Sequence, residues 1–189
     1  MTVNHVADTI VYGIWDEVEM KFNGFIIVML IGVLLVGSVS CLGSSASKPT
    51  ASDVPEGWSL SNEEPYGTYL ESDGTQWGLV EYTNSDESNF VQIYYGNIPR
   101  ELIDHETDPD YLLARAILES KTFEPDETGN MIASGQIAGY TKKYDSDSDW
   151  YEMDIVFVLE SACIDIYTIY DATPEAEEQA MSIINSISF

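Results

Sequence analysis

Alternating hydrophobic and polar residues predict strands in the part of the chain that follows residue 57. Within 89–96, apolar side chains occupy every second position, which is the period of a strand with one buried face. The runs 66–72 and 76–84 have the same character and flank Asp73 and Gly74, a dipeptide typical of tight hairpin turns. This pattern predicts a β-hairpin followed by a third strand.

A second group of strands is predicted later in the chain. The segment 131–144 is predicted to be one long strand that bends at Gly135 and Gly139. The segments 150–159 and 163–171 are predicted to form a further hairpin, and the first of them contains the uninterrupted apolar run IVFVL. Because such a run has no polar side, we expect that strand to be covered on both faces.

Two helices are predicted by their start signals. Asp108 and Thr173 are residue types that favour N-caps, and each is followed by a proline, Pro109 and Pro174, at the first helical position. The second helix carries one apolar stripe, made of Ala176, Ala180, Ile183, Ile184 and Ile187. The order of strands, helix, strands and helix predicts an α+β fold in which helices flank a central, largely antiparallel sheet.

The chain begins with a segment of different character. Residues 25–36 read FIIVMLIGVLLV, and Lys21 precedes them, as in a signal peptide with a basic residue before its apolar core. Residues 1–19 are net acidic, which does not suit such a peptide. We therefore expect the native start at Met20, with 1–19 as an extension that the native protein lacks, and a signal peptide over 20–40.

A cysteine ends the apolar segment. The stretch SVSCLGSS around Cys41 resembles the lipobox of secreted lipoproteins, and of archaeal lipoproteins in particular, although Ser38 departs from the aliphatic residue preferred at its position. The resemblance implies cleavage before Cys41 and a lipid on its thiol, which places the protein on the extracytoplasmic face of the cell membrane. Two acyl chains hold a protein stably on a bilayer. An uncleaved membrane-spanning helix over 22–42 is the alternative, since about 20 apolar residues span a bilayer.

The net charge of the chain limits the kinds of molecule that it can bind. The chain has 33 acidic residues against 7 basic ones and a formal net charge of -26. Such a surface repels phosphate backbones and anionic head groups, so we expect no nucleic-acid partner and a membrane attachment through the lipid on Cys41. Small and polar residues dominate 42–56, which predicts a flexible tether to one domain over 57–189.

The domain also carries a family resemblance. The segments SGQIAGYTKKYD (134–145) and TPEAEEQAMSIINSISF (173–189), with the two long strands between them, resemble the PsbP-like group, which includes the Ran-binding Mog proteins and many bacterial lipoproteins. The resemblance implies an α/β/α sandwich that binds partners or assists complexes. The group shares no catalytic set, so the resemblance implies no cofactor and no functional residue. It favours a non-catalytic binding or accessory domain, with an envelope protein as a candidate partner.

Three aspartates form the candidate metal site. Asp145, Asp147 and Asp149 alternate as in a calcium-binding loop. Trp150 and Val156 stand where the loop of an EF-hand needs glycine and glutamate, so the EF-hand pattern fails. Three carboxylates on a hairpin tip still offer oxygen ligands, which leaves weak calcium binding as a hypothesis beside a solvated turn.

Candidate catalytic residues are few. His105 lies in the acidic stretch IDHETD, and an envelope-associated hydrolase that brings acidic residues and His105 into one cleft is the alternative function. The sequence has no nucleophile elbow of the GxSxG type, and Cys163 lies in an apolar strand, where a thiol is usually a small buried hydrophobe. Aromatic residues are plentiful, and we expect most of them in the core and the rest on a binding surface. They include Trp77, Tyr82, Tyr94, Tyr95, Trp150, Tyr151, Tyr167 and Tyr170.

Overall fold

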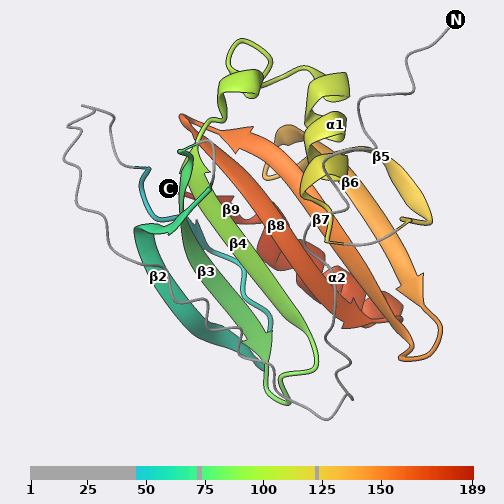
Figure 1. Ribbon diagram of the computed structural model, residues 1–189. Coiled ribbons are helices and arrows are strands. Elements are labelled where there is room, and N and C mark those ends of the chain that lie inside the picture. Colours follow the sequence, from blue (N-terminus) through green and yellow to red (C-terminus); the bar gives the residue numbers. More distant parts are fainter. Residues whose placement is uncertain (1–45, 72–73, 122–123) are drawn as a thin grey trace, which may run out of the picture. The chain divides into compact units, whose positions relative to one another are not determined.

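Seven strands of the described residues form one antiparallel sheet. The computed structural model describes residues 46–71, 74–121 and 124–189. The strands are β2 (Trp58–Leu70), β3 (Gln76–Asn84), β4 (Phe90–Asn97), β5 (Glu127–Ala133), β6 (Gln136–Asp145), β7 (Trp150–Leu159) and β8 (Ala162–Asp171). Their order across the sheet is β2-β3-β4-β8-β7-β6-β5, and every neighbouring pair is antiparallel (Figure 1). The pairing of β4 with β8 brings the two halves of the sequence together.

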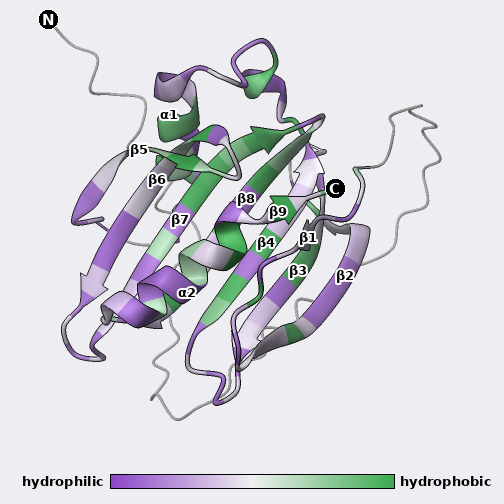
Figure 2. Ribbon diagram, turned by 180° about the vertical axis from the view of Figure 1, so that it is seen from behind, coloured by the Kyte–Doolittle hydropathy of each residue, from purple (hydrophilic) through white to green (hydrophobic). Residues whose placement is uncertain are grey.

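Two α-helices of the described residues lie on opposite faces of this sheet. Helix α1 (Pro109–Glu119) contacts β5, β6 and β7, whereas α2 (Pro174–Asn185) contacts β4 and β8. The sheet is seen from its two sides in Figures 1 and 2, with α1 in front in the first view and α2 in front in the second. A short 3-10 helix, η2 (Arg100–Leu102), precedes α1. We call the two sides of the sheet the α1 face and the α2 face.

The α2 face holds the larger hydrophobic core. Ile155 and Phe157 of β7 and Ile166 of β8 are fully buried there, and they pack with Ala180 and Ile183 of the helix. A fully buried side chain of this size contributes about 1.5–3 kcal/mol relative to an exposed one. This face is therefore the main source of hydrophobic stabilisation.

The α1 face has a smaller core, in which a glycine allows close contact between a strand and α1. Val156 and Val158 alternate with the α2-face residues of β7 and pack with Leu112 and Ala116 of α1. A Cβ atom at Gly139 of β6 would lie 2.3 Å from the backbone oxygen of Leu112, so the absence of a side chain lets the helix approach the strand. The apolar run of β7 is covered on both faces, which confirms the prediction.

Both predicted helix starts are confirmed. The Asp108 side chain accepts a hydrogen bond from the Asp110 N–H at 3.0 Å, and the Thr173 hydroxyl accepts one from the Ala176 N–H at 3.2 Å. Such caps satisfy amide groups that the first turn of a helix leaves unpaired. Helix α2 ends before Ile187, so this member of the predicted stripe is buried in a short strand instead.

The prediction of a single strand over 131–144 is wrong. The chain reverses at Ser134 and Gly135, whose φ angles are 49° and 76°, and β5 and β6 pair as a hairpin. Two successive residues with positive φ are typical of a type I′ turn, which matches the twist of the flanking strands. Serine is uncommon in this conformation, which is why the turn has a weak sequence signal.

The structure differs from the predicted flexible tether over 42–56. Strand β1 (Thr50–Ala51) pairs with β9 (Ile187–Ser188), and the Asp53 N–H donates a hydrogen bond to the Ser186 hydroxyl at 3.0 Å. Backbone groups that pair with the domain belong to it, whatever the composition of the segment. The second half of the predicted tether is therefore part of the folded unit.

The described residues form a mostly β-sheet fold with two α-helices. The large antiparallel sheet is confirmed, but the fold is richer in strands than the expected α+β arrangement, because β2 is long and 131–144 forms two strands. Among the described residues, no helix is both long enough and apolar enough to cross a bilayer. The predicted extension 1–19, signal peptide 20–40 and lipid site Cys41 lie outside the described residues.

Candidate functional site

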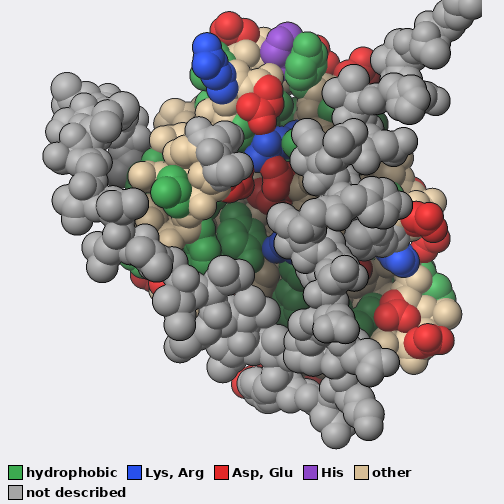
Figure 3. Space-filling view, in the orientation of Figure 1, with side chains coloured by type: hydrophobic (Ala, Val, Ile, Leu, Met, Phe, Trp, Pro, Cys, Tyr) green, Lys and Arg blue, Asp and Glu red, His purple; other side chains and the backbone are tan. Residues whose placement is uncertain are grey.

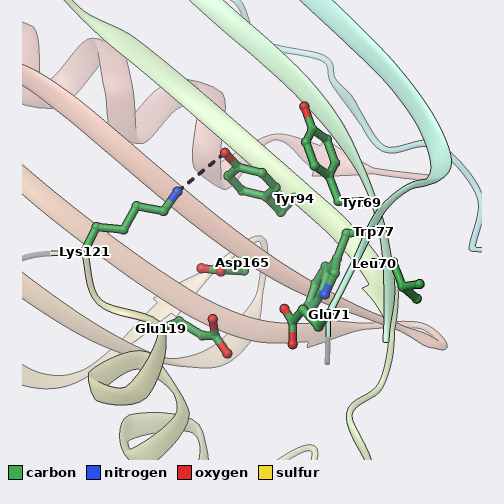
Figure 4. A pocket seen from close by; sticks show the side chains of 8 residues that line it. All are labelled: Tyr69, Leu70, Glu71, Trp77, Tyr94, Glu119, Lys121 and Asp165. Carbon is green, nitrogen blue, oxygen red and sulfur yellow. Dashed lines mark hydrogen bonds between the residues drawn. The ribbon is translucent and has the colours of Figure 1, made fainter. Parts of the chain in front are cut away.

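An open pocket of about 290 Å³ lies on the α1 face, beside the end of α1. Eight side chains line it: Tyr69, Leu70, Glu71, Trp77, Tyr94, Glu119, Lys121 and Asp165. We call it the Trp77–Asp165 pocket. Figure 4 shows its aromatic rings facing acidic and basic groups. In the space-filling view, side chains of both charges lie next to hydrophobic ones on this face (Figure 3).

Neighbouring strands place the main residues of the pocket. Tyr94 of β4 and Asp165 of β8 lie directly opposite each other in the strand register. Trp77 of β3 lies opposite Gly96 of β4, and a Cβ atom on Gly96 would come within 2.7 Å of the indole ring. The glycine thus leaves the room that the indole fills. With 4% of its surface exposed, Trp77 forms a fixed wall.

Two buried polar atoms of this pocket have no hydrogen-bond partner in the described part of the chain. They are Trp77 Nε1, a donor, and Asp165 Oδ1, an atom of a carboxyl group. An unpaired buried donor or acceptor costs about 1–3 kcal/mol, and native proteins leave few of them. A ligand that accepts a hydrogen bond from the indole and interacts with the carboxyl group would remove both penalties.

Burial changes the protonation of the aspartates on this face. It raises the pKa of Asp165 to about 8, and the negative charge of Glu119 adds to the effect. Burial also raises the pKa of Asp154 to about 6, although the Ser120 hydroxyl donates to this carboxyl group at 3.1 Å and opposes the shift. At neutral pH, Asp165 is mostly protonated and Asp154 mostly charged.

One arginine pairs with the acidic residues at the rim of the pocket. Arg115 of α1, which is 6% exposed, forms ion pairs with Glu101 at 2.6 Å, with Glu71 at 3.7 Å and with Glu119. Burial raises the pKa of Glu119, and the charge of Arg115 opposes this shift only in part. Three carboxyl groups share one guanidinium, so the local potential is negative.

A lysine supplies a second positive charge. Lys121 Nζ lies 4.5 Å from the ring centres of both Tyr94 and Tyr167, where the electron-rich face of each ring attracts the ammonium group. Burial raises the pKa of Tyr94 to about 12, with a contribution from the charge of Asp165, so the Tyr94 hydroxyl stays protonated. The rings on this face therefore bind one ammonium group of the chain itself.

The arrangement suits the binding of a small organic molecule. Ligand pockets combine apolar and aromatic walls with a few polar groups that fix orientation, and they start at about 300 Å³. Here Trp77 and Tyr94 supply the aromatic walls. Asp165 donates or accepts according to its protonation, and Glu71 and Glu119 accept.

Sequence reasoning found part of this pocket. It placed some of the aromatic residues on a binding surface, and Trp77 and Tyr94 line the pocket. It did not find the charged residues. A signal was present, because Asp154 and Asp165 are single carboxylates within the apolar strand segments MDIV and CIDI. A charge at such a position is costly to bury and points to a site.

His105 lies in a different place, on the loop between η2 and α1. Its ring stacks on Tyr111 with 3.7 Å between the ring centres, and its Nδ1 atom lies 3.8 Å from Asp108 Oδ2. It does not belong to the residues that line the Trp77–Asp165 pocket. The hydrolase alternative needs His105 and clustered carboxyl groups in one cleft, and the structure does not bring them together there.

The three aspartates of the candidate calcium site form the turn between β6 and β7. Asp145 Oδ1 accepts a hydrogen bond from the Asp147 N–H at 2.9 Å, and Asp149 Oδ1 accepts one from the Tyr144 hydroxyl at 2.8 Å. Over residues 46–71, 74–121 and 124–189, no group of three or more His, Cys, Asp or Glu side chains is placed to hold a metal ion. The carboxylates act as local partners of the turn.

Cys163 of β8 is a free thiol with none of its surface exposed. It packs in the α1-face cluster with Trp77 and Val158. Burial raises the pKa of this thiol, so it stays protonated and unreactive at neutral pH. Cys163 is the small buried hydrophobe that the sequence predicts.

A comparison of the chain with protein-family models found no match, and a comparison with curated proteins found none either. The functional interpretation therefore depends on the geometry of the Trp77–Asp165 pocket and on the sequence around Cys41.

Proposed function

We propose that this chain is a binding protein, held on the outer face of the cell membrane by a lipid on Cys41, whose domain takes up a small organic ligand in the Trp77–Asp165 pocket. One observation carries the proposal: within the described part of the chain, Trp77 Nε1 and Asp165 Oδ1 are both buried without a hydrogen-bond partner, and their residues line a single open pocket. A fold selected only for stability would have apolar side chains at these positions, because unpaired buried polar groups are costly.

The membrane location rests on the sequence before the domain. The basic Lys21, the apolar segment 25–36 and Cys41 follow one another as in a lipoprotein precursor. Nine residues lead from Cys41 to Thr50, where the pairing of β1 begins, and a fully extended chain of that length spans about 30 Å. The lipid would thus hold the domain close to the bilayer.

The assignment of the domain to the PsbP-like kind of fold belongs to the same proposal. Helices on both faces of an antiparallel sheet support an α/β/α sandwich of the PsbP-like kind. The resemblance to that group implies a domain that binds partners or assists complexes, which agrees with a binding function in our proposal. An envelope protein is the second kind of partner for such a domain.

Nuclear magnetic resonance tests the binding function. The isotope-labelled full chain in detergent micelles is titrated with a library of small organic cations, anions and neutral compounds, and the indole N–H signal of Trp77 is assigned with the Trp77→Phe variant. We expect at least one compound to shift this signal, and to shift it equally in Asp147→Asn, which changes an exposed turn. If no compound moves the Trp77 signal, the pocket is not a binding site.

Mass spectrometry tests the location. Chain isolated from cell membranes should begin at Cys41 and carry a lipid mass on that residue, and Cys41→Ser should lack the lipid. An intact chain with an unmodified Cys41 thiol would overturn the lipid anchor. If that intact chain stayed in the membrane fraction, it would favour the uncleaved helix over 22–42.

A hydrolase remains the alternative function because of one feature. Asp165 is mostly protonated and Asp154 mostly charged at neutral pH, so an acid and a base lie on the same face of the sheet. Because the hydrolase alternative needs His105 beside these acidic residues, it predicts that the variant His105→Ala changes the response of the pocket. We expect His105→Ala to leave the ligand-induced shift of the Trp77 signal as it is in the wild type.

A further inference from the structure

The charges around the Trp77–Asp165 pocket do not balance. Three carboxyl groups share Arg115, and Lys121 is the basic residue among those that line the pocket. Even with Asp165 protonated, the acidic groups of this cluster outnumber the basic ones. The chain as a whole carries a formal charge of -26, and a surface of one sign raises the local concentration of ions of the other sign.

The aromatic rings on this face already hold one ammonium group, which shows the kind of group that they attract. Lys121 Nζ already lies over Tyr94 and Tyr167, at 4.5 Å from each ring centre. Tyr69 meets Tyr94 edge to face at 6.1 Å between ring centres, and Trp77 completes the wall (Figure 4). The faces of tryptophan and tyrosine are the best aromatic partners of cations in proteins.

We propose that the ligand is a small organic ammonium cation that also carries a hydrogen-bond acceptor, with its charge beside Asp165 and its acceptor at Trp77. This inference rests on the proposed binding function and names the class of its ligand. The cation would neutralise the surplus negative charge, and the acceptor would pair with Trp77 Nε1, which has no partner among the described residues. A neutral molecule of the same shape would satisfy the indole but leave the charges unbalanced.

Binding of such a cation should release a proton. Burial raises the pKa of Asp165 to about 8, and a positive charge beside the carboxyl group favours its ionised form. Below pH 8 the affinity should therefore rise with pH, by at most tenfold per unit, and then level off.

The groups that face Asp165 from the elements around it are Tyr94 of β4, Asp154 of β7, Arg115 and Glu119 of α1, Lys121 after α1, and Cys163 of β8. Asp154 titrates near pH 6, so the comparison is made from pH 7 to pH 8, where about a five-fold gain is expected.

Isothermal titration calorimetry with two matched probes tests the inference. The full chain in micelles is titrated at constant ionic strength with choline chloride and with dimethylbutanol, the neutral analogue in which a carbon atom replaces the choline nitrogen. Choline carries both the cationic group and a hydroxyl acceptor. We expect choline to bind at least tenfold more tightly than the alcohol, and we expect both to shift the Trp77 signal if they bind.

Variants locate the effect at the pocket. Asp165→Asn keeps the shape of the side chain but cannot take a negative charge, so it should lose at least tenfold in choline affinity together with the gain between pH 7 and pH 8. Asp147→Asn changes the same residue type in an exposed turn and should bind choline as the wild type does. Should circular dichroism show that Asp165→Asn does not fold, Glu119→Gln replaces it and should weaken choline binding severalfold.

The outcomes separate the inference from the binding function. Equal affinity for the two probes, or shifts of the Trp77 signal by neutral or anionic compounds but not by choline, would overturn the cation inference and leave the binding function standing. Choline binding that Asp165→Asn, or its substitute Glu119→Gln, leaves unchanged would place the cation elsewhere and also overturn the inference. If nothing in the library moves the Trp77 signal, the inference and the binding function both fail.

Discussion

The α2 face and the α1 face are built from alternate residues of the same strands, yet they bury different chemistry. On β8, Ile164 and Ile166 reach the apolar core under α2, whereas Asp165, on the other side, lines the Trp77–Asp165 pocket. On β7, the fully buried Ile155 and the mostly buried Asp154 show the same contrast. Because adjacent residues of a strand point to opposite faces, one face can supply stability while the other keeps polar groups that reduce it.

The helices explain why the two faces are filled to different extents. Helix α2 packs on β4 and β8 in the middle of the sheet, whereas α1 packs on β5, β6 and β7 (Figures 1 and 2). On the α1 face, the pocket residues of β3, β4 and β8 therefore lie on strands that α1 does not mainly contact. Polar groups kept there at a cost in stability are expected to serve binding.

Removing a side chain from the α2 face should have the largest effect on stability. Ile155→Ala deletes a fully buried side chain of the larger core, and we expect it to lower the free energy of unfolding by about 2–5 kcal/mol. Denaturant unfolding of the full chain, followed by circular dichroism, measures the change. Ile132→Ala makes the same change on a side chain that is 61% exposed and should cost under about 0.5 kcal/mol. A loss below about 1 kcal/mol for Ile155→Ala would mean that this face does not carry the stability.

A glycine tests how tightly the α1 face is closed. Gly139→Ala would place its Cβ atom 2.3 Å from the Leu112 backbone oxygen, and a helix backbone cannot yield without moving. We expect a loss of about 1–3 kcal/mol in the free energy of unfolding, as in other overpacked cores. At Gly129 the nearest atoms are 3.3 Å or more away and belong to the Tyr140 ring, so Gly129→Ala is the matched control and should cost less. Equal losses would show that α1 lies loosely on β6.

Asp165, on the α1 face, should make the free energy of unfolding depend on pH. Its pKa is about 8 in the folded chain and close to 3.9 in an unfolded one, so the folded state binds more protons between these values. Stability from this group is therefore highest below pH 4 and is lost as the pH rises to 8, with a slope of up to about 1.4 kcal/mol per pH unit. Unfolding measured from pH 6 to pH 8 should show this fall in the wild type.

The variant Asp165→Asn should make the pH curve flatter in that window, because the amide does not titrate. The control is Asp147→Asn, an exposed aspartate whose replacement should keep the wild-type slope. A slope that survives in Asp165→Asn would assign the titration to another group and would contradict the raised pKa of Asp165.

Local signals in the sequence predicted those parts of the fold that depend on neighbouring residues. The hairpin of β7 and β8 was predictable from its two apolar segments, the burial of β7 on both faces from its uninterrupted apolar run, and the caps at Asp108 and Thr173 from residue type. The turn at Ser134 was not, because a serine with positive φ is held there by the pairing of β5 with β6 rather than by its own preference.

The pocket could not be predicted from local sequence patterns, for a different reason. Trp77 and Asp165 come together because β3, β4 and β8 are neighbours, and the step from β4 to β8 joins strands that are far apart in the sequence. Alternation shows that a residue faces one side, but it does not show which helix covers that side. That Trp77 Nε1 finds no hydrogen-bond partner in residues 46–71, 74–121 and 124–189 follows from how these residues fold together and from no local stretch of the sequence.

The helix caps give the smallest expected effects and compare the two faces most directly. Thr173→Ala removes the cap of α2, and Asp108→Ala removes that of α1, and each should lower the free energy of unfolding by about 1 kcal/mol. Thr173→Ser keeps a hydroxyl acceptor and should cost less. Each cap stabilises the start of one helix. Similar losses in the free energy of unfolding for the two variants would therefore mean that the two helix starts contribute equally, and that the faces differ only in their buried side chains. A much larger loss for Thr173→Ala would show that the α2 face depends on its helix as well as on its core.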